Sequence, residues 1–201
     1  MGLPAQKHAY SIAEYLEFER DADVRHEFHD GEILAMSGGS LEQSLITINV
    51  GAELHNALKG KPCRVADSNL RVRIPRQARY MYPDALVFCG SPEFDPQDDK
   101  RHTIVNPRVI IEVLSPSTEA YDRGDKFSHY REIDSFEEYI LISQHKPNVE
   151  SWLRQSDGAW SIVNYIGLDT VATVRSLGIE IPMAEIYAGV EWPLTDDLAE
   201  A

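Results

Sequence analysis

The chain has 201 residues, 43% of them hydrophobic and 26% charged, and its formal net charge is −14. No repeat or low-complexity linker is visible, and no apolar run approaches the ~18 residues of a membrane-spanning helix. We therefore expect one globular domain over residues 1–201, with its core at about 10–190.

The 33 acidic residues outnumber the 19 basic ones, which disfavours tight non-specific binding of nucleic acid, because such binding neutralises phosphates. The acidic balance does not exclude a nuclease, since charge can be distributed asymmetrically over a surface. Cys63 and Cys89 form neither a disulfide framework nor a metal-binding spacing, so we expect both to be reduced core residues. The N-terminal residues lack the apolar core of a signal peptide, and we expect a cytoplasmic location.

The first third of the chain predicts a helix, a hairpin and a second helix. Ser11 and Glu14 form a capping box at the start of a helix over about 11–20. Asp30-Gly31 between two extended segments predicts a β-hairpin. The second helix runs from Leu41 to about Leu58, with Ser40 as its cap. We expect its buried face to consist of the apolar residues and the histidine that recur at three- and four-residue steps: Leu41, Leu45, Ile48, Ala52 and His55.

A basic stretch follows, in and after a strand predicted over 70–74. Its arginines are Arg71, Arg73, Arg76 and Arg79. Contact with backbone phosphates and a solvated strand face are equally good interpretations. The loop at about 90–106 is acidic and a poor DNA clamp, so we expect a solvated loop, a lid or an oligomer contact there. The aspartates of this loop and the carboxylates of the C-terminal tail, for which a solvated position is expected, are Asp95, Asp98, Asp99, Asp196, Asp197 and Glu200.

Two short apolar runs in the middle of the chain predict strands that are buried on both faces, at about 84–88 and 109–114. Asp84 opens the first run and Glu112 interrupts the second. A carboxylate in a buried strand is costly unless a cation compensates it. A helix predicted over about 122–133 carries Asp122, Lys126 and Tyr130 at four-residue steps, on one face. Two carboxylates followed by a lysine suggest a metal-dependent hydrolytic site.

The remaining third predicts mainly β-structure. We expect a buried strand at 138–142, followed by an antiparallel pair of 148–153 with 160–166 across Asp157-Gly158. An edge strand at 171–174 and a short closing helix at 182–187 complete the chain's predicted elements.

The order Pro83-Asp84, then Glu112 to Thr118, then Asp122, Lys126 and Tyr130 resembles the PD-(D/E)XK nuclease superfamily. Within it, the chain is similar to the Uma-two-type family of putative restriction endonucleases, and the resemblance covers roughly residues 10 to 190. One position departs from the usual superfamily pattern: Leu114 stands where a lysine follows the acidic residue by two. We interpret Lys126 as a migrated lysine that returns to the site from the following helix.

The resemblance implies an α/β fold with a restriction endonuclease-like core, a mixed central β-sheet flanked by helices and additional antiparallel hairpins. It implies an endonuclease that uses Mg²⁺ or Mn²⁺ to hydrolyse phosphodiester bonds in nucleic acid, with DNA the expected substrate. Asp84, Glu112 and Lys126 are then the catalytic residues, and Asp84, Glu112 and the backbone carbonyl of Val113 bind the metal. The residues that the resemblance and the helical spacing suggest as supporting groups are Glu27, Gln43, Asp122 and Tyr130.

Two alternatives stay open from the residues alone. In one, the chain keeps the nuclease fold as a non-catalytic binding or assembly protein, and Glu112 and Lys126 form a buried ion pair. The other concerns self-association: Trp152, Trp160 and Trp192 are either the core of a homodimer interface or packing residues of the same domain.

Overall fold

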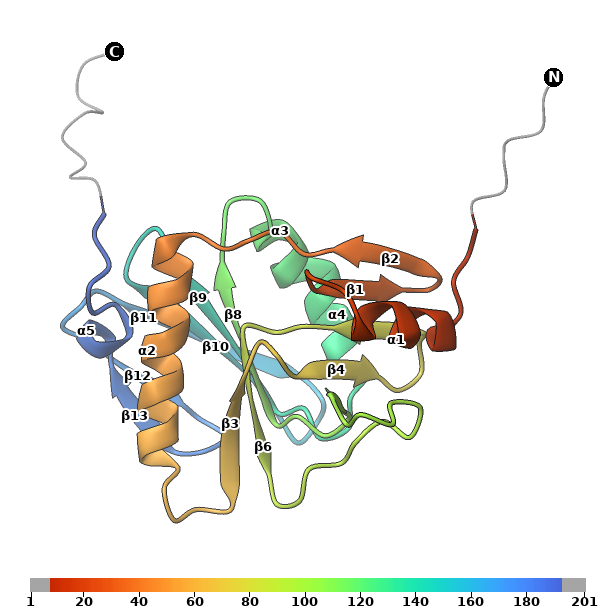
Figure 1. The fold of residues 1–201 in the computed structure, drawn as a ribbon. Coiled ribbons are helices and arrows are strands. Elements are labelled where there is room, and N and C mark those ends of the chain that lie inside the picture. Colours follow the sequence, from red (N-terminus) through yellow and green to blue (C-terminus); the bar gives the residue numbers. More distant parts are fainter. Residues whose placement is uncertain (1–7, 193–201) are drawn as a thin grey trace.

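The computed structural model describes residues 8–192, and the acidic tail residues Asp196, Asp197 and Glu200 lie outside this range. A six-stranded sheet crosses the centre of the molecule (Figure 1). Its strands β8 and β9 are parallel and all other neighbours are antiparallel, so the sheet is mixed, as predicted. In spatial order the strands are β11 (Trp160–Ile166), β10 (Asn148–Arg154), β9 (Glu138–Ser143), β8 (Val109–Leu114), β6 (Ala85–Cys89) and β3 (Cys63–Asp67).

A second sheet carries the N-terminal part of the fold. The capping box at Ser11 and Glu14 begins α1 (Ile12–Arg20), which packs through Tyr15 against this sheet. The predicted hairpin at Asp30-Gly31 is confirmed, and both residues have positive φ, 49° and 102°. The five strands in order are β2 (Glu32–Ala35), β1 (His26–His29), β5 (Arg79–Met81), β4 (Arg71–Ile74) and β7 (Thr103–Ile104).

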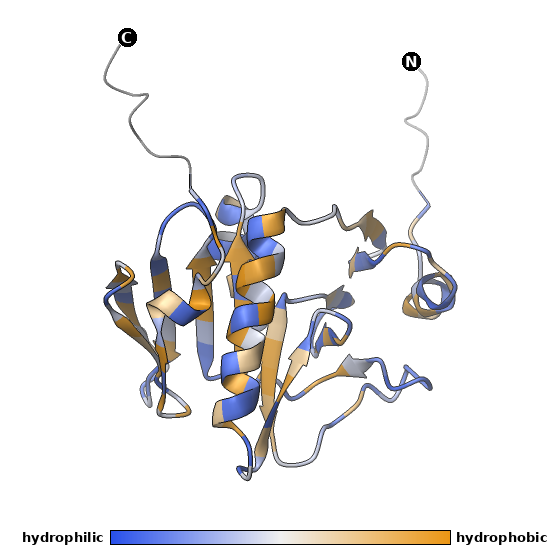
Figure 2. Cartoon of the chain, turned by 60° about the vertical axis from the view of Figure 1, so that its left-hand side comes forward, coloured by the Kyte–Doolittle hydropathy of each residue, from blue (hydrophilic) through white to orange (hydrophobic). Residues whose placement is uncertain are grey.

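The second helix, α2 (Leu41–Ala57), begins at Ser40 as predicted, but its predicted buried face is wrong. Leu41 and Ile48 are 69% and 66% exposed, whereas Ile46, Val50 and Leu54 are buried against the central sheet. The helix therefore carries apolar residues on two faces, and its hydrophobic and polar positions alternate along the visible side (Figure 2). Periodicity cannot decide which of two apolar faces meets the sheet. Beside α2, the same face is covered by β12 (Val171–Val174), β13 (Ile179–Pro182) and α5 (Met183–Ile186).

A helical segment covers the opposite face of the central sheet. It begins at residue 119, earlier than predicted, and its middle part has π-helical hydrogen bonds. Its apolar residues join Phe136 and Tyr139 in a second core cluster. π-helical turns are rare and occur often at functional sites. The three consecutive parts are α3 (Glu119–Tyr121), η1 (Asp122–Lys126) and α4 (Phe127–Tyr130).

The late hairpin of β10 and β11 is confirmed, but its tryptophans pack within the chain. The rings of Trp152 and Trp160 stand edge-on to Phe127, with centroids 4.8 and 5.0 Å away. The indole of Trp192 donates to the carbonyl of Gln144 at 2.9 Å. The tryptophans thus give no reason to expect a homodimer.

Three of the four arginines of the basic stretch are paired with carboxylates, so they are neither free for phosphates nor a solvated face. Arg71 is 4% exposed and pairs with Asp98 at 3.0 Å, and Arg73 pairs with Asp95 at 2.6 Å. Arg79 pairs with Asp30 at 2.6 Å, while Arg76 is exposed. The prediction of a solvated acidic loop is therefore wrong for Asp95 and Asp98, which are buried. Of the three loop aspartates, only Asp99 is strongly exposed.

The prediction of reduced cysteines is also wrong. Cys63 and Cys89 form a disulfide that joins β3 to β6. The antiparallel register places the two residues directly opposite each other. No helix within residues 8–192 combines the length and hydropathy needed to cross a bilayer. The cytoplasmic location stays a prediction.

The pairing of Arg71 with Asp98 predicts a large difference between two neighbouring variants. Asp98→Ala removes the acceptor of Arg71, His102 and Thr103, and leaves a buried cation without its carboxylate. We expect it to lower the free energy of unfolding by about 3 kcal/mol in denaturant titration. Asp99→Ala removes an exposed carboxylate and should change stability little. Equal effects would show that Arg71 does not depend on this pair.

Candidate active site

Asp84 and Glu112 meet because of the register of two central strands. Ala85 of β6 lies opposite Ile111 of β8, so the next pair along this antiparallel ladder is Asp84 and Glu112. The backbone N–H of Val113 donates to Asp84 Oδ2 at 2.7 Å, and the N–H of Asp84 lies 3.4 Å from Glu112 Oε2. The two carboxylates are therefore held side by side by strand pairing.

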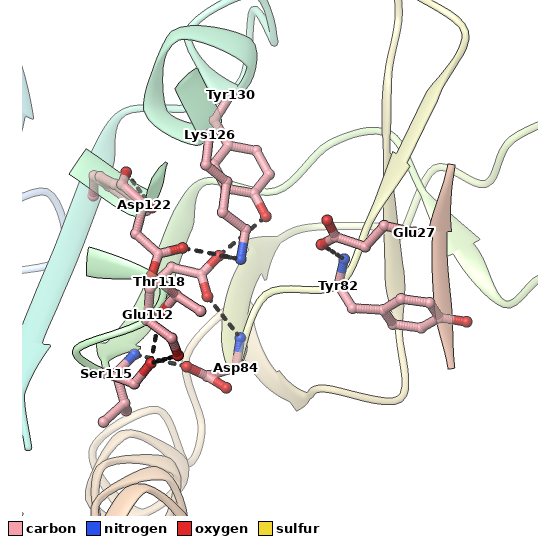
Figure 3. A network of polar contacts seen from close by, with 12 residues as sticks. Glu27, Tyr82, Asp84, Glu112, Ser115, Thr118, Asp122, Lys126 and Tyr130 are labelled. Atoms are coloured by element: carbon pink, nitrogen blue, oxygen red, sulfur yellow. Dashed lines mark hydrogen bonds and ion pairs between the residues drawn. The ribbon is translucent and has the colours of Figure 1, made fainter. Parts of the chain in front are cut away.

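The helical segment brings a cation and a hydroxyl to Glu112 (Figure 3). Lys126 Nζ lies 2.7 Å from Glu112 Oε1 and 3.4 Å from Asp122 Oδ1. The Tyr130 hydroxyl donates to the same Glu112 oxygen at 3.1 Å. Although Leu114 stands at the usual lysine position on β8, the structure places Lys126 beside the acidic residue from the next helix.

Two more predicted residues flank this group. The side-chain amide of Gln43, in the first turn of α2, donates to Asp84 Oδ1 at 3.1 Å. Glu27 of β1 accepts from the N–H of Tyr82 at 3.1 Å and pairs with His29 Nε2 at 3.1 Å. Figure 3 shows Glu27 across from the Lys126 ammonium, on the side away from Asp122. The structure thus gathers all the predicted site residues around one point, with Glu27 at its margin.

A sequence model described as "Uma2: Putative restriction endonuclease" matches residues 12–184. The chain belongs to the Uma2 family. Two uncharacterized proteins of Synechocystis sp. are similar over most of their length. Protein slr1290 is 36% identical over 181 residues, which cover 90% of this chain and 92% of the relative. Protein sll1609 is 33% identical over 157 residues, which cover 78% and 88%.

A crystal structure described as that of a putative nuclease belonging to DUF820, from Anabaena variabilis, matches the fold with a TM-score of 0.70. The match covers 89% of this chain and 97% of that one, at 16% sequence identity. The Uma2 chain therefore has the restriction endonuclease-like fold that its sequence predicted.

In the Uma2 site, burial and the Lys126 charge act in opposite directions on the pKa of the Asp84 and Glu112 carboxyls, and burial prevails. Burial raises the pKa of Asp84 above its ordinary value, against the opposing Lys126 charge and the N–H of Val113. Burial also raises the pKa of Glu112 well above its ordinary value, and the carboxylates of Asp122 and Asp84 add to that rise. One ammonium thus does not fully compensate the acidic residues in this group.

Lys126 and Glu27 keep their charges. Burial alone lowers the pKa of Lys126, but Glu112, Glu27 and Asp122 outweigh burial, so the pKa rises well above its ordinary value. Burial alone raises the pKa of Glu27, but the hydrogen bond with His29 and the Lys126 charge outweigh it, so the pKa falls. Lys126 is therefore an ammonium at neutral pH, and Glu27 is one of the carboxylates that hold it in that form.

A cleft of about 1080 Å³ leads to Asp84 between α2, β3 and the loop after β2. Its lining includes the exposed Ile48 and two further carboxylates, Asp23 and Asp67. The lining also includes Arg25, whose guanidinium donates a hydrogen bond to the Ser68 hydroxyl at 2.7 Å. The approach to Asp84 is thus apolar and acidic rather than basic.

The structure adds two residues that the sequence interpretation missed. His29 contacts Glu27, and the signal was their spacing of two, which puts both side chains on one face of a strand. The Tyr121 hydroxyl is buried without a hydrogen-bond partner within residues 8–192. Burial raises the pKa of Tyr121, and the nearby Glu27 carboxylate adds to the rise, so the phenol stays protonated and is a donor. No spacing rule pointed to Tyr121.

The donor set suits a hard divalent cation. No three His, Cys, Asp or Glu side chains within residues 8–192 are grouped to hold a metal by themselves. Mg²⁺ is commonly bound by one or two carboxylates and completes its shell with water and substrate oxygens. Asp84 and Glu112 supply two adjacent carboxylates whose raised pKa values reflect incomplete compensation of their charge.

The raised pKa of Asp84 predicts a pH-dependent gain in stability on substitution. The unfolded carboxyl ionises near pH 4, whereas the folded one ionises at higher pH, so ionisation costs stability as pH rises through this window. Asp84→Asn removes the cost, and its carbonyl can still accept from Val113. Without metal, we expect a melting temperature a few degrees above wild type at pH 8 and an equal one at pH 3.

The matched control is Asp134→Asn, which makes the same charge change at an exposed position. It should leave the melting temperature nearly unchanged at pH 8. A lower melting temperature for Asp84→Asn at pH 8 would mean that a cation stabilises the Asp84 carboxylate, and that the charge of Asp84 is fully compensated without metal.

Proposed function

We propose that this Uma2 chain is a metal-dependent endonuclease that hydrolyses phosphodiester bonds in nucleic acid, with DNA as the expected substrate. The observation that carries the proposal is the arrangement of Asp84 beside Glu112, with Lys126 Nζ 2.7 Å from Glu112. Membership of a family described as putative restriction endonucleases supports it, as does the fold shared with a putative nuclease.

Mg²⁺ or Mn²⁺ is the proposed cofactor, held by Asp84, Glu112 and the carbonyl of Val113. When bound, such an ion stabilises charge on a phosphate and lowers the pKa of a bound water. The chain's part is to hold both carboxylates in place before the ion arrives. Strand pairing fixes Asp84 through the Val113 N–H, and Gln43 fixes its other oxygen.

Lys126 is the proposed catalytic cation. Because it is charged and lies within the buried group, it can orient an attacking water or offset charge that develops on the phosphate. Asp122 contacts its ammonium, and Tyr130 holds the Glu112 oxygen that it pairs with. Both are positioning residues in this proposal. Glu27 keeps Lys126 charged from the other side.

A second candidate function is non-catalytic binding. It is favoured by the acidic cleft and by the pairing of Arg71, Arg73 and Arg79 with carboxylates, which leaves these arginines unable to neutralise phosphates. In this alternative, Glu112 and Lys126 form a buried ion pair that only supports the fold.

Plasmid nicking with and without Mg²⁺ tests the proposal. We expect the wild type to nick only with Mg²⁺, and Asp84→Asn and Lys126→Met to lose at least about 100-fold in rate. The matched controls, Asp134→Asn and Lys59→Met, change the same charges at exposed positions and should keep the wild-type rate.

The other outcomes are equally decisive. Equal nicking by the wild type and both site variants would mean a contaminant or another site. The absence of cleavage by the wild type under any metal condition, with the protein shown to be folded, would favour the non-catalytic alternative.

A further inference from the structure

The strand β11 forms one edge of the central sheet, on the side of the molecule away from α1 (Figure 1). It is paired with β10 over all seven of its residues. No strand within residues 8–192 pairs with its outer side. An exposed edge of this length offers a row of backbone donors and acceptors to another strand.

The register shows which residues offer these groups. The N–H of Gly167 donates to the carbonyl of Pro147, and the N–H of Gln155 donates to that of Ala159. In an antiparallel ladder hydrogen-bonded pairs recur every second residue, so the odd-numbered residues of β11 bond to β10. The N–H and C=O groups of Ile162 and Asn164 therefore point outward. The Ile166 carbonyl is already occupied by the Thr170 hydroxyl, at 2.6 Å.

The side chains around this edge are apolar and exposed. Ile162 is 54% exposed and Ile166 is 69% exposed. Five of the eleven exposed large hydrophobic residues within residues 8–192 fall in the ten positions 162–171. They are Ile162, Val163, Ile166, Leu168 and Val171. Because side chains alternate along a strand, Ile162 and Ile166 share one face of β11. Large apolar side chains gathered on an exposed surface are typical of an interaction site.

The near absence of charged residues along this edge favours a second copy of the chain as the partner. Asp169 is the only charged residue in positions 158–174, although 26% of the chain is charged. The opposite edge of the same sheet, β3, carries Arg64 and Asp67, the kind of charges that protect an edge from pairing. Two copies with a net charge of −14 repel each other, and an edge almost without charge is where they approach at the least cost.

We propose that two copies of this chain associate through β11, in antiparallel pairing about a twofold axis. An antiparallel strand pair is self-complementary, so one edge serves both copies and the assembly closes as a dimer. The outward groups of Ile162 and Asn164 in each copy bond to the same strand of the other copy. The exposed isoleucines of both copies are covered at the same contact. The rings of Trp152 and Trp160 stay packed on Phe127 in this arrangement, and the dimer does not depend on the nuclease proposal.

Sedimentation equilibrium at micromolar concentration, combined with hydrogen exchange, tests the proposal on the full chain. We expect twice the chain mass of 22.7 kDa and slow exchange at the Ile162 and Asn164 amides. Ile162→Lys places a charge at the contact and should give a monomer with fast exchange at Asn164. Ile48→Lys, an equally apolar and exposed position on α2, should keep the dimer. Circular dichroism establishes that both variants are folded.

A wild-type monomer under these conditions would overturn the proposal. So would a dimer whose Ile162 and Asn164 amides exchange freely, because its contact would lie elsewhere. A dimer that Ile48→Lys dissociates and Ile162→Lys does not would assign the interface to α2.

Discussion

The structure depends on the burial of two carboxylates on neighbouring strands. Asp84 and Glu112 are brought together by the register of β6 and β8, where Glu112 is buried and Asp84 is half-buried at the end of the cleft. Such a pair is unfavourable unless hydrogen bonds and a cation offset its charge. Lys126 provides the cation, and donors from Val113, Gln43 and Tyr130 provide hydrogen bonds. The raised pKa values of both acids mean that this compensation is incomplete.

The surrounding elements can be understood from this constraint. The π-helical turn contains both Asp122 and Lys126. Lys126 reaches the Glu112 carboxylate from the face opposite α2, and Asp122 contacts the Lys126 ammonium. The first turn of α2 reaches Asp84 through Gln43, and β1 of the second sheet brings Glu27 towards Lys126. Elements from both sheets thus converge on one charged group, while the arginines of β4 are paired with the acidic loop and take no part.

The sequence predicted which candidate site residues lie together better than it predicted packing. A charge that interrupts an apolar strand is a local signal, and so is the four-residue spacing of Asp122, Lys126 and Tyr130. The pairing of Arg71 with Asp98, in contrast, joins residues 27 apart, and no local pattern encodes it. The same holds for the Cys63–Cys89 disulfide, which follows from strand register. Helix α2 has two apolar faces, and which of them is buried depends on how the helix packs on the central sheet, which periodicity does not show.

A crystal soaked in Mn²⁺ tests most directly whether Asp84 and Glu112 together bind a divalent ion. We expect an anomalous difference peak within about 2.2 Å of a carboxylate oxygen of each residue. The same peak should be missing in Asp84→Asn crystals. A wild-type crystal with no peak there at millimolar Mn²⁺, or with Lys126 as the only partner of Glu112, would contradict a metal site at these two carboxylates.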